Sequence, residues 1–196
     1  MRISLVLMAL FGVVHFSNDF QVNAAKRPLR IAGNFEEIET CKNVKVFLQV
    51  KNVTYRREKN GITLVDALLP TSKNLKSLSK IEARVTDCAD GVSYNTCQYV
   101  NTYRFTSGLC RLLTSDSMAW SGVVKAISPP VRCPVLAANY VMTNGSLNMA
   151  AVEQFAGPLF PKLLGRTVLA EVRGYDENRE LFACILLKIS FLRVRN

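Results

Sequence analysis

Alternating hydrophobic and polar residues predict that most of this chain forms β-strands. In residues 44–51, apolar side chains occupy every second position, which is the period of a strand with one buried face. Lys59, Asn60 and Gly61 are then expected to form a turn, with residues 62–69 as the returning strand of a hairpin. Further strands are predicted for residues 81–86, running into a cysteine, and for residues 99–105.

The hydrophobic period changes in the middle of the chain and returns to strands at its end. Between residues 109 and 127, apolar residues recur every three or four positions, which predicts one or two short helices ending before Pro129. Strands resume at residues 138–143, and residues 167–172 and 180–192 form a predicted hairpin. The last strand is apolar on both faces, as a central strand is. The predicted fold class is therefore mainly β, a sandwich or cup with a small helical insertion.

The first residues have the pattern of a secretory leader. Met1 and Arg2 precede an apolar run over residues 3–16 that is too short for a transmembrane helix, and small residues ending at Ala24 offer a cleavage site. We expect residues 1–24 to be a signal peptide. Residues 25–196 then suit a single domain, since domains usually have about 100–200 residues. The product is predicted to be secreted and extracellular.

All the cysteines follow this leader. They are Cys41, Cys88, Cys97, Cys110, Cys133 and Cys184. An even number of cysteines behind a secretory leader is typical of a disulfide framework, although six cysteines can pair in fifteen ways and the residues alone leave the choice open. Two N-glycosylation sequons, at Asn52 and Asn144, agree with secretion.

The residues that would support catalysis are scarce. The single histidine, His15, lies in the predicted leader, and a Ser-His-Asp triad, a Cys-His pair or a histidine-based zinc site all need imidazole. Asp87 and Asp176 lie beside turn-forming residues, where a solvated role is expected. We therefore expect a binding protein that is not an enzyme and that uses no metal and no organic cofactor.

The net charge of +10 at pH 7 favours anionic partners. Lysine and arginine are scattered along the chain with no dense basic block, which is typical of a solvated surface. Nucleic acid is not an expected partner of a secreted chain.

The order of the later residues resembles the ganglioside GM2-activator family. The resemblance is carried by Cys110, the helical section, Cys133 with Pro134, a strand with Asn139 and Tyr140, the segment GPLFP at residues 157–161, Gly165 before a strand, and a charged turn leading to Phe182, Ala183 and Cys184. The segment NVTYRR at residues 52–57 is more similar to the insect branch, with its CheB-type chemosensory proteins and uncharacterised secreted relatives. The likeness spans residues 41–192. The chain departs from the mammalian activator in having six cysteines and not eight.

The resemblance implies three disulfides, which are Cys41–Cys184, Cys88–Cys97 and Cys110–Cys133. It also implies an apolar cavity between splayed sheets. The side chains expected to line this cavity come from the inward strand faces and the helical insertion: Val46, Leu48, Val50, Val85, Phe105, Trp120, Val168, Ala170, Val172, Ile185 and Leu187. Trp120 is expected to serve either as a lid or as a core anchor.

A second apolar group lies in a stretch interrupted by prolines and Gly165, where a loop is predicted. It consists of Leu159, Phe160, Leu163 and Leu164. An apolar loop of this kind either forms a cavity mouth that contacts membrane or caps the end of the core. Lys162 and Arg166 beside it suit anionic headgroups.

These features predict a secreted carrier that binds a lipid, glycolipid or hydrocarbon, with an anionic membrane surface or a receptor as a second partner. Through the insect branch, the resemblance implies a role in chemosensation or pheromone perception. The alternative is a secreted protein-interaction module or receptor co-factor whose core is filled by its own side chains.

Overall fold

The computed structural model describes residues 29–89 and 94–195. The predicted signal peptide, with His15 and the cleavage site after Ala24, lies outside these residues, as does part of the segment between Cys88 and Cys97. The predicted limits of the domain and the secretory leader therefore stay predictions.

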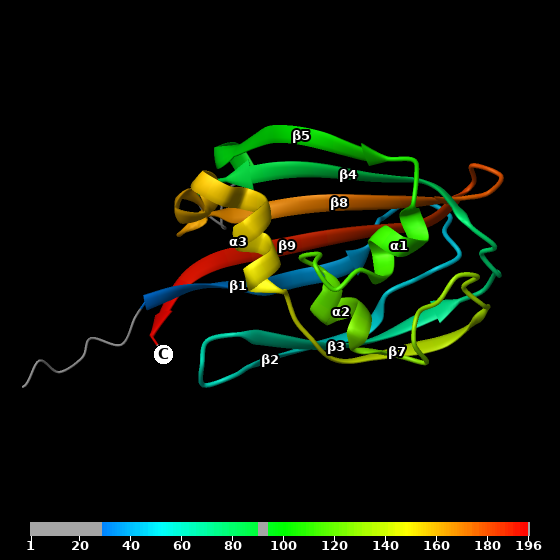
Figure 1. Ribbon diagram of the computed structural model, residues 1–196, viewed down its shortest axis with the longest axis horizontal. Coiled ribbons are helices and arrows are strands. Elements are labelled where there is room, and N and C mark those ends of the chain that lie inside the picture. Colours follow the sequence, from blue (N-terminus) through cyan, green and yellow to red (C-terminus); the bar gives the residue numbers. More distant parts are fainter. Residues whose placement is uncertain (1–28, 90–93, 196) are drawn as a thin grey trace, which may run out of the picture.

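The larger of two antiparallel sheets contains five strands in the order β1-β9-β8-β4-β5 (Figure 1). Their bounds are β1 Leu29–Thr40, β9 Leu181–Arg195, β8 Thr167–Asp176, β4 Leu78–Cys88 and β5 Cys97–Phe105. The strand β9 is central, between β1 and β8, as its two apolar faces predict.

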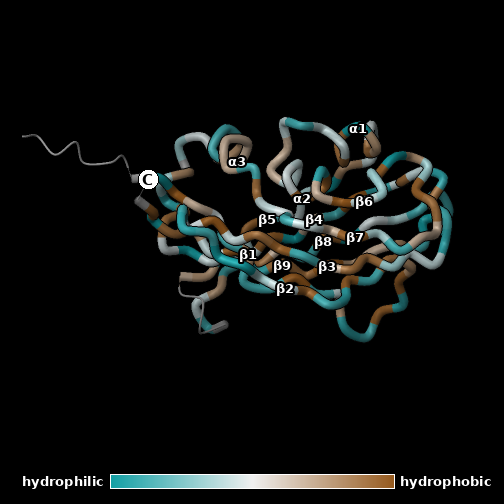
Figure 2. Tube along the Cα trace, turned by 90° about the horizontal axis from the view of Figure 1, so that it is seen from below, coloured by the Kyte–Doolittle hydropathy of each residue, from teal (hydrophilic) through white to brown (hydrophobic). Residues whose placement is uncertain are grey.

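The second sheet contains four strands in the order β2-β3-β7-β6, and short helices complete the fold. The strands are β2 Lys51–Arg57, β3 Thr63–Thr71, β7 Ala138–Gly145 and β6 Ile127–Ser128. The helices are α1 Leu109–Thr114, α2 Ser121–Lys125 and α3 Met149–Ala156, with 3-10 helices η1 Tyr94–Thr96 and η2 Gly157–Leu163. Figure 2 shows α1, α2 and α3 on the same side of the molecule. The predicted fold class is confirmed.

The core lies where β1 and β9 face β3 and β7. Along β3, every second residue from Thr63 to Thr71 is buried and those between are half-buried, so one face of the strand points inward. Phe35 of β1 and Ile189 and Phe191 of β9 are buried against this face and belong to the same cluster. The two sheets are therefore in close contact on this side.

The predicted strand at residues 44–51 is wrong. These residues form an irregular connection, with an isolated bridge at Leu48, and β2 begins only at Lys51. The backbone N–H groups of Phe47 and Leu48 donate to the Phe182 carbonyl, at 2.9 and 3.0 Å, while that of Gln49 donates to the Pro70 carbonyl at 3.1 Å. Because its hydrogen bonds are divided between the two sheets, the segment links them and joins neither.

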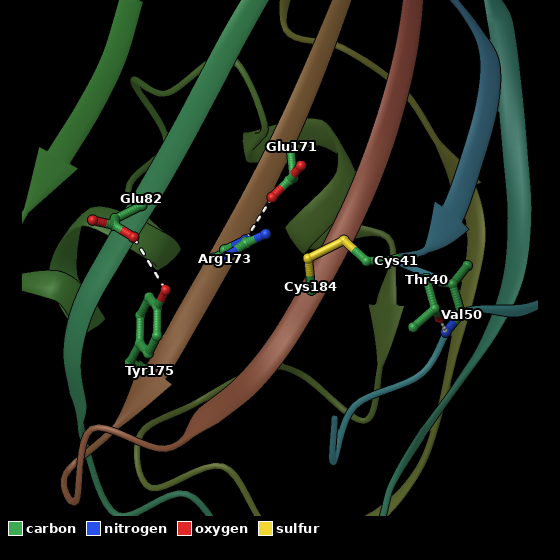
Figure 3. Close-up of a disulfide and its surroundings, with 8 residues drawn as sticks. All are labelled: Thr40, Cys41, Val50, Glu82, Glu171, Arg173, Tyr175 and Cys184. Carbon is green, nitrogen blue, oxygen red and sulfur yellow. Dashed lines mark hydrogen bonds and ion pairs between the residues drawn. A yellow bond between two sulfur atoms is a disulfide. The ribbon is translucent and has the colours of Figure 1, made fainter. Parts of the chain in front are cut away.

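The three disulfides have the pairing that the family resemblance implies. Cys41–Cys184 joins the residue after β1 to β9 (Figure 3), Cys88–Cys97 joins β4 to β5, and Cys110–Cys133 joins α1 to the segment before β7. This prediction is confirmed, and it agrees with formation in an oxidising compartment. A bridge closing a loop as long as that of Cys41–Cys184 is expected to stabilise the fold by about 2–4 kcal/mol.

A buried carboxylate holds the turn between β8 and β9. Asp176 is 0% exposed and accepts hydrogen bonds from the backbone N–H of Asn178 (2.9 Å) and of Glu180 (2.8 Å), while Lys73 Nζ lies 2.8 Å from its Oδ2. Burial by itself would raise the pKa of Asp176, but these hydrogen bonds outweigh it and lower the pKa below its ordinary value. The solvated role expected for Asp176 is therefore wrong.

We expect Asp176→Asn to lower the free energy of unfolding by about 1–3 kcal/mol at neutral pH, because it weakens charge-assisted hydrogen bonds to a buried group. The pKa of Asp176 is lower in the folded than in the unfolded chain, where it is about 3.9, so this stabilisation is present above about pH 4 and is lost as the pH falls through the folded pKa. Urea unfolding of both proteins as a function of pH checks this. A difference that stays constant on acidification would contradict it, and Asp116→Asn, at an exposed carboxylate, is the control.

Candidate functional site

The inner face of the five-stranded sheet carries a continuous apolar surface. The register sets Tyr103, Ala83, Val172 and Ile185 in one cross-strand row and Asn101, Val85, Ala170 and Leu187 in the next. Phe105 and Ile81 begin a third row, which ends at Gly174 and Ala183. We call the apolar residues of these rows the inner floor: Ile81, Ala83, Val85, Tyr103, Phe105, Ala170, Val172, Ala183, Ile185 and Leu187.

The inner floor faces the space between the sheets. Ile185 and Leu187 pack against the core, whereas Leu186 and Lys188, which alternate with them along β9, lie on the opposite face of the sheet. Six of the predicted cavity residues belong to this floor, and Val168 lies one row beyond it, packed against the core. The structure thus brings together seven of the eleven side chains that were predicted to line a cavity.

The floor is less buried than an ordinary sandwich interior. Val85, Ala170 and Val172 are only half-buried, although they point inward, whereas the inward residues Val65 and Ala67 of β3 are 0% and 5% exposed. The second sheet therefore covers the floor less completely towards β4 and β5 than near β1 and β9. An apolar surface that keeps part of its exposure inside the fold can take up a nonpolar ligand.

Helix α3 crosses one end of the floor. At its start, Met149 Sδ accepts a hydrogen bond from the backbone N–H of Gly33 on β1, at 3.2 Å, and at its end the ring of Phe155 meets that of Tyr103 on β5 edge-on at 6.2 Å. Figure 1 shows α3 passing across β8, β9 and β1. Gly33 permits this approach, because a Cβ there would lie 2.9 Å from Met149 Sδ.

An ion pair marks the same end of the floor. Asp87 follows Val85 by two residues on β4 and is the cross-strand partner of Val168, so its side chain lies on the inner face. Arg166, which precedes β8, donates from Nε to Asp87 Oδ1 at 3.0 Å and makes a second contact from Nη2 to Oδ2. This hydrogen bonding to Asp87 raises the pKa of Arg166. The sequence predicts Asp87 in a solvated turn, whereas the structure places it on a strand, partly exposed and paired with Arg166.

The other predicted cavity residues are not part of the floor, although Leu48 forms an isolated β-bridge with Ala183 at its edge. Val46, Leu48 and Val50 belong to the connection between the sheets, where Val46 is buried and the other two pack half-buried against the core. Trp120 is half-buried, and its Nε1 donates to the Leu113 carbonyl at 3.2 Å. This bond joins the segment before α2 to α1, so the structure favours an anchor over a lid. The assignment of all eleven residues to a ligand cavity stays a prediction.

The predicted mouth is a 3-10 helix and not an irregular loop. Leu163 packs half-buried against the core, Phe160 and Leu164 are also half-buried, and the side chain of Leu159 lies outside the described residues. Among the described residues of this region, the most exposed large apolar side chain is that of Phe155, at 76%, which the sequence pattern did not predict. Contact of the four predicted residues with a membrane stays a prediction.

Helix α3 itself was missed, although the sequence carries its signals. The Asn148 side chain accepts a hydrogen bond from the Ala151 N–H, which is the geometry of a helix N-cap, and Gly157 ends the helix with a φ of 50°. Between them the sequence MAAVEQFA contains strong helix formers. An asparagine before such a run and a glycine after it could have identified the helix.

A shallow hollow of about 270 Å³ lies on the opposite, outer face of the five-stranded sheet. Its lining includes carboxylates of Glu37, Glu39 and Glu171, the cations Arg84 and Lys188, and the apolar residues Leu169 and Leu186. Ala170 and Leu187 of the inner floor also border it. Figure 3 shows Glu171 paired with Arg173 beside the Cys41–Cys184 disulfide. The two cysteine sulfurs and a Glu171 oxygen lie within 4.8 Å of one another, but the disulfide removes the thiolates that a metal ion would need.

Both sequon asparagines are exposed and lie on strands of the four-stranded sheet, away from the inner floor. Asn144 Oδ1 accepts a hydrogen bond from Arg56 Nη2 at 2.5 Å. Glycosylation at Asn52 and Asn144 stays a prediction. Among the described residues, no helix combines the length and apolar character needed to cross a bilayer.

Comparison with solved structures gives several matches. A solved structure of a Niemann-Pick type C2 protein from Japanese carpenter ant matches over 82% of this chain and 92% of that chain, with 12% sequence identity and a TM-score of 0.26. No family model matches the sequence, and neither does any curated protein. Because the identity and the TM-score are both low, we transfer neither ligand nor activity from that protein to this chain.

The accessible space over the inner floor can be tested by adding volume at two matched alanines. We expect Ala170→Leu on the inner floor to change the free energy of unfolding by less than about 1 kcal/mol, because the added methyl groups enter accessible space. Ala67→Leu on β3 should lower it by about 1–3 kcal/mol, because the inner face there is filled. Urea unfolding of the two variants measures both values. Equal, large losses would show that the floor is packed as tightly as the core.

Proposed function

We propose that this protein is a non-enzymatic carrier that holds the hydrocarbon chain of a lipid or related hydrophobic molecule against the inner floor. The observation that carries this proposal is the half-exposure of Val85, Ala170 and Val172 on the inward face of the sheet. They adjoin Ile185 and Leu187, so the apolar surface is continuous across β4, β8 and β9. Water against such a surface is unfavourable, so a nonpolar ligand that displaces it gains free energy.

The size of this gain is sufficient for useful affinity. Each methylene transferred from water to an apolar site contributes about 0.8 kcal/mol, so a chain of about ten methylenes gains about 8 kcal/mol. A dissociation constant of 1 μM corresponds to about 8 kcal/mol, and association itself costs several kcal/mol. A single alkyl chain of somewhat greater length therefore binds in the micromolar range.

The α3 end of the floor suits transfer at a membrane. Phe155 projects into solvent, and Lys162 on η2 is exposed close to it in sequence. An exposed aromatic ring together with a cation fits the apolar and anionic components of a lipid surface. Transfer at a membrane and a chemosensory role both extend the carrier proposal. They rest on the family resemblance as well as on these positions.

A pair of tryptophan variants tests whether ligand binds on the inner floor. Ala170 and Leu169 are neighbours on β8, and alternation along the strand directs the Ala170 side chain to the inner face and the Leu169 side chain to the outer face. We expect Ala170→Trp to weaken binding of the fluorescent probe N-phenyl-1-naphthylamine by at least about 10-fold, because an indole there fills the ligand space, while Leu169→Trp leaves it unchanged. Fluorescence titration, with competition by a long alkane, provides the measurement.

Three results of this titration would overturn the proposal. Loss of binding only in Leu169→Trp would place the site in the outer hollow. Equal binding by both variants would show that the probe does not bind on the inner floor. No displacement by alkane and no retained lipid in the protein as purified from the secreting cell would favour the alternative, a protein-interaction module with a filled core.

A further inference from the structure

We propose that the bound molecule has an uncharged hydroxyl-bearing head that lies against the Asp87–Arg166 ion pair, with its hydrocarbon tail along the inner floor. This inference rests on the proposed function and names the class of ligand. It predicts a neutral alcohol, and it argues against both a fatty acid and a cationic amphiphile.

The Asp87–Arg166 ion pair lies next to the apolar rows of the floor. Asp87 lies two residues beyond Val85 on β4, which places it about 7 Å farther along the inner face. Its cross-strand partner is Val168, and the partner of Val85 is Ala170, so the ion pair directly adjoins the last apolar row of the floor. A head at Asp87 and a tail over Val85 and Ala170 are therefore parts of one continuous site.

Both members of the ion pair are partly exposed. The side chains of Arg166 and Asp87 are 34% and 30% exposed, so the pair keeps polar surface that a ligand can reach. Among the described residues of β4 and β8 that alternate onto the inner face, the charged ones are Asp87 at this end and Asp176 at the other. Asp176 is 0% exposed and paired with Lys73, so a ligand on this face can reach Asp87 but not Asp176. Farther along the floor the rows continue through Ala83 and Ile81 and offer no comparable polar group on β4. The orientation of an amphipathic ligand follows from this asymmetry.

The ion pair has no net charge. Arg166 and Asp87 neutralise each other through two hydrogen-bonded contacts, so the site has no net charge to offer an ionic head. A carboxylate head would be attracted by Arg166 but repelled by Asp87, and an ammonium head would meet the reverse, so neither gains a net attraction. A hydroxyl group can donate to the Asp87 carboxylate and accept from the Arg166 guanidinium at the same time. The pair therefore selects a neutral head that is both donor and acceptor.

The test compares dodecan-1-ol with dodecanoate as competitors of the same fluorescent probe, at a pH where dodecanoate is ionised. We expect the wild-type protein to bind the alcohol at least about 10-fold more tightly than the carboxylate. Asp87→Asn leaves Arg166 with an uncompensated positive charge, so the preference should shift towards dodecanoate by about 10-fold or more. Arg166→Gln leaves Asp87 uncompensated and should shift the preference farther towards the alcohol.

The control is Asp116→Asn, which removes the same charge from an exposed partner of Lys125 near α2 and should leave the preference unchanged. Equal wild-type affinity for the two competitors, or a preference that moves in neither paired variant, would overturn the inference while leaving the carrier function intact. Failure of the wild-type protein to bind either competitor would overturn the carrier function as well. If one paired variant does not fold, the opposite shift expected of the other still decides the question.

Discussion

The structure depends on hydrophobic contact between the two sheets along one side only. Phe35, Ile189 and Phe191 pack against the buried face of β3, and the Cys41–Cys184 disulfide fixes the chain where it leaves β1 beside β9. On the other side, β4 and β8 present equally apolar residues that the second sheet does not cover. One interface therefore supplies the stability, and its limited width leaves the inner floor accessible.

The helices and the polar groups are arranged around that floor. Helix α3 crosses one end of the floor, from a contact with Gly33 on β1 to a contact with Tyr103 on β5. The Asp87–Arg166 pair lies at the same end and joins β4 to the segment after η2. A cover made of short helices and one ion pair is held by fewer buried contacts than the core is, and local opening there costs less free energy.

Hydrophobic periodicity predicted most strands and the inward set of β8 and β9, because alternation determines which side chains share a face. It failed at residues 44–51, where an alternating segment divides its hydrogen bonds between Phe182 and Pro70 of different sheets. No local pattern shows that division. The Asp87–Arg166 pair joins residues 79 positions apart, so it depends on tertiary structure that composition does not reveal. Phe155 was missed because α3 was not recognised from Asn148 and Gly157.

The most direct test of an accessible inner floor is a crystal structure of the protein soaked with a long-chain bromoalkane, with the bromine located by its anomalous scattering. The account predicts a bromine peak between the sheets, over Ala170 and Val172 and beneath the helices. A peak confined to the outer hollow near Leu169 and Leu186, or no peak in crystals that hold the compound elsewhere on the protein, would contradict it.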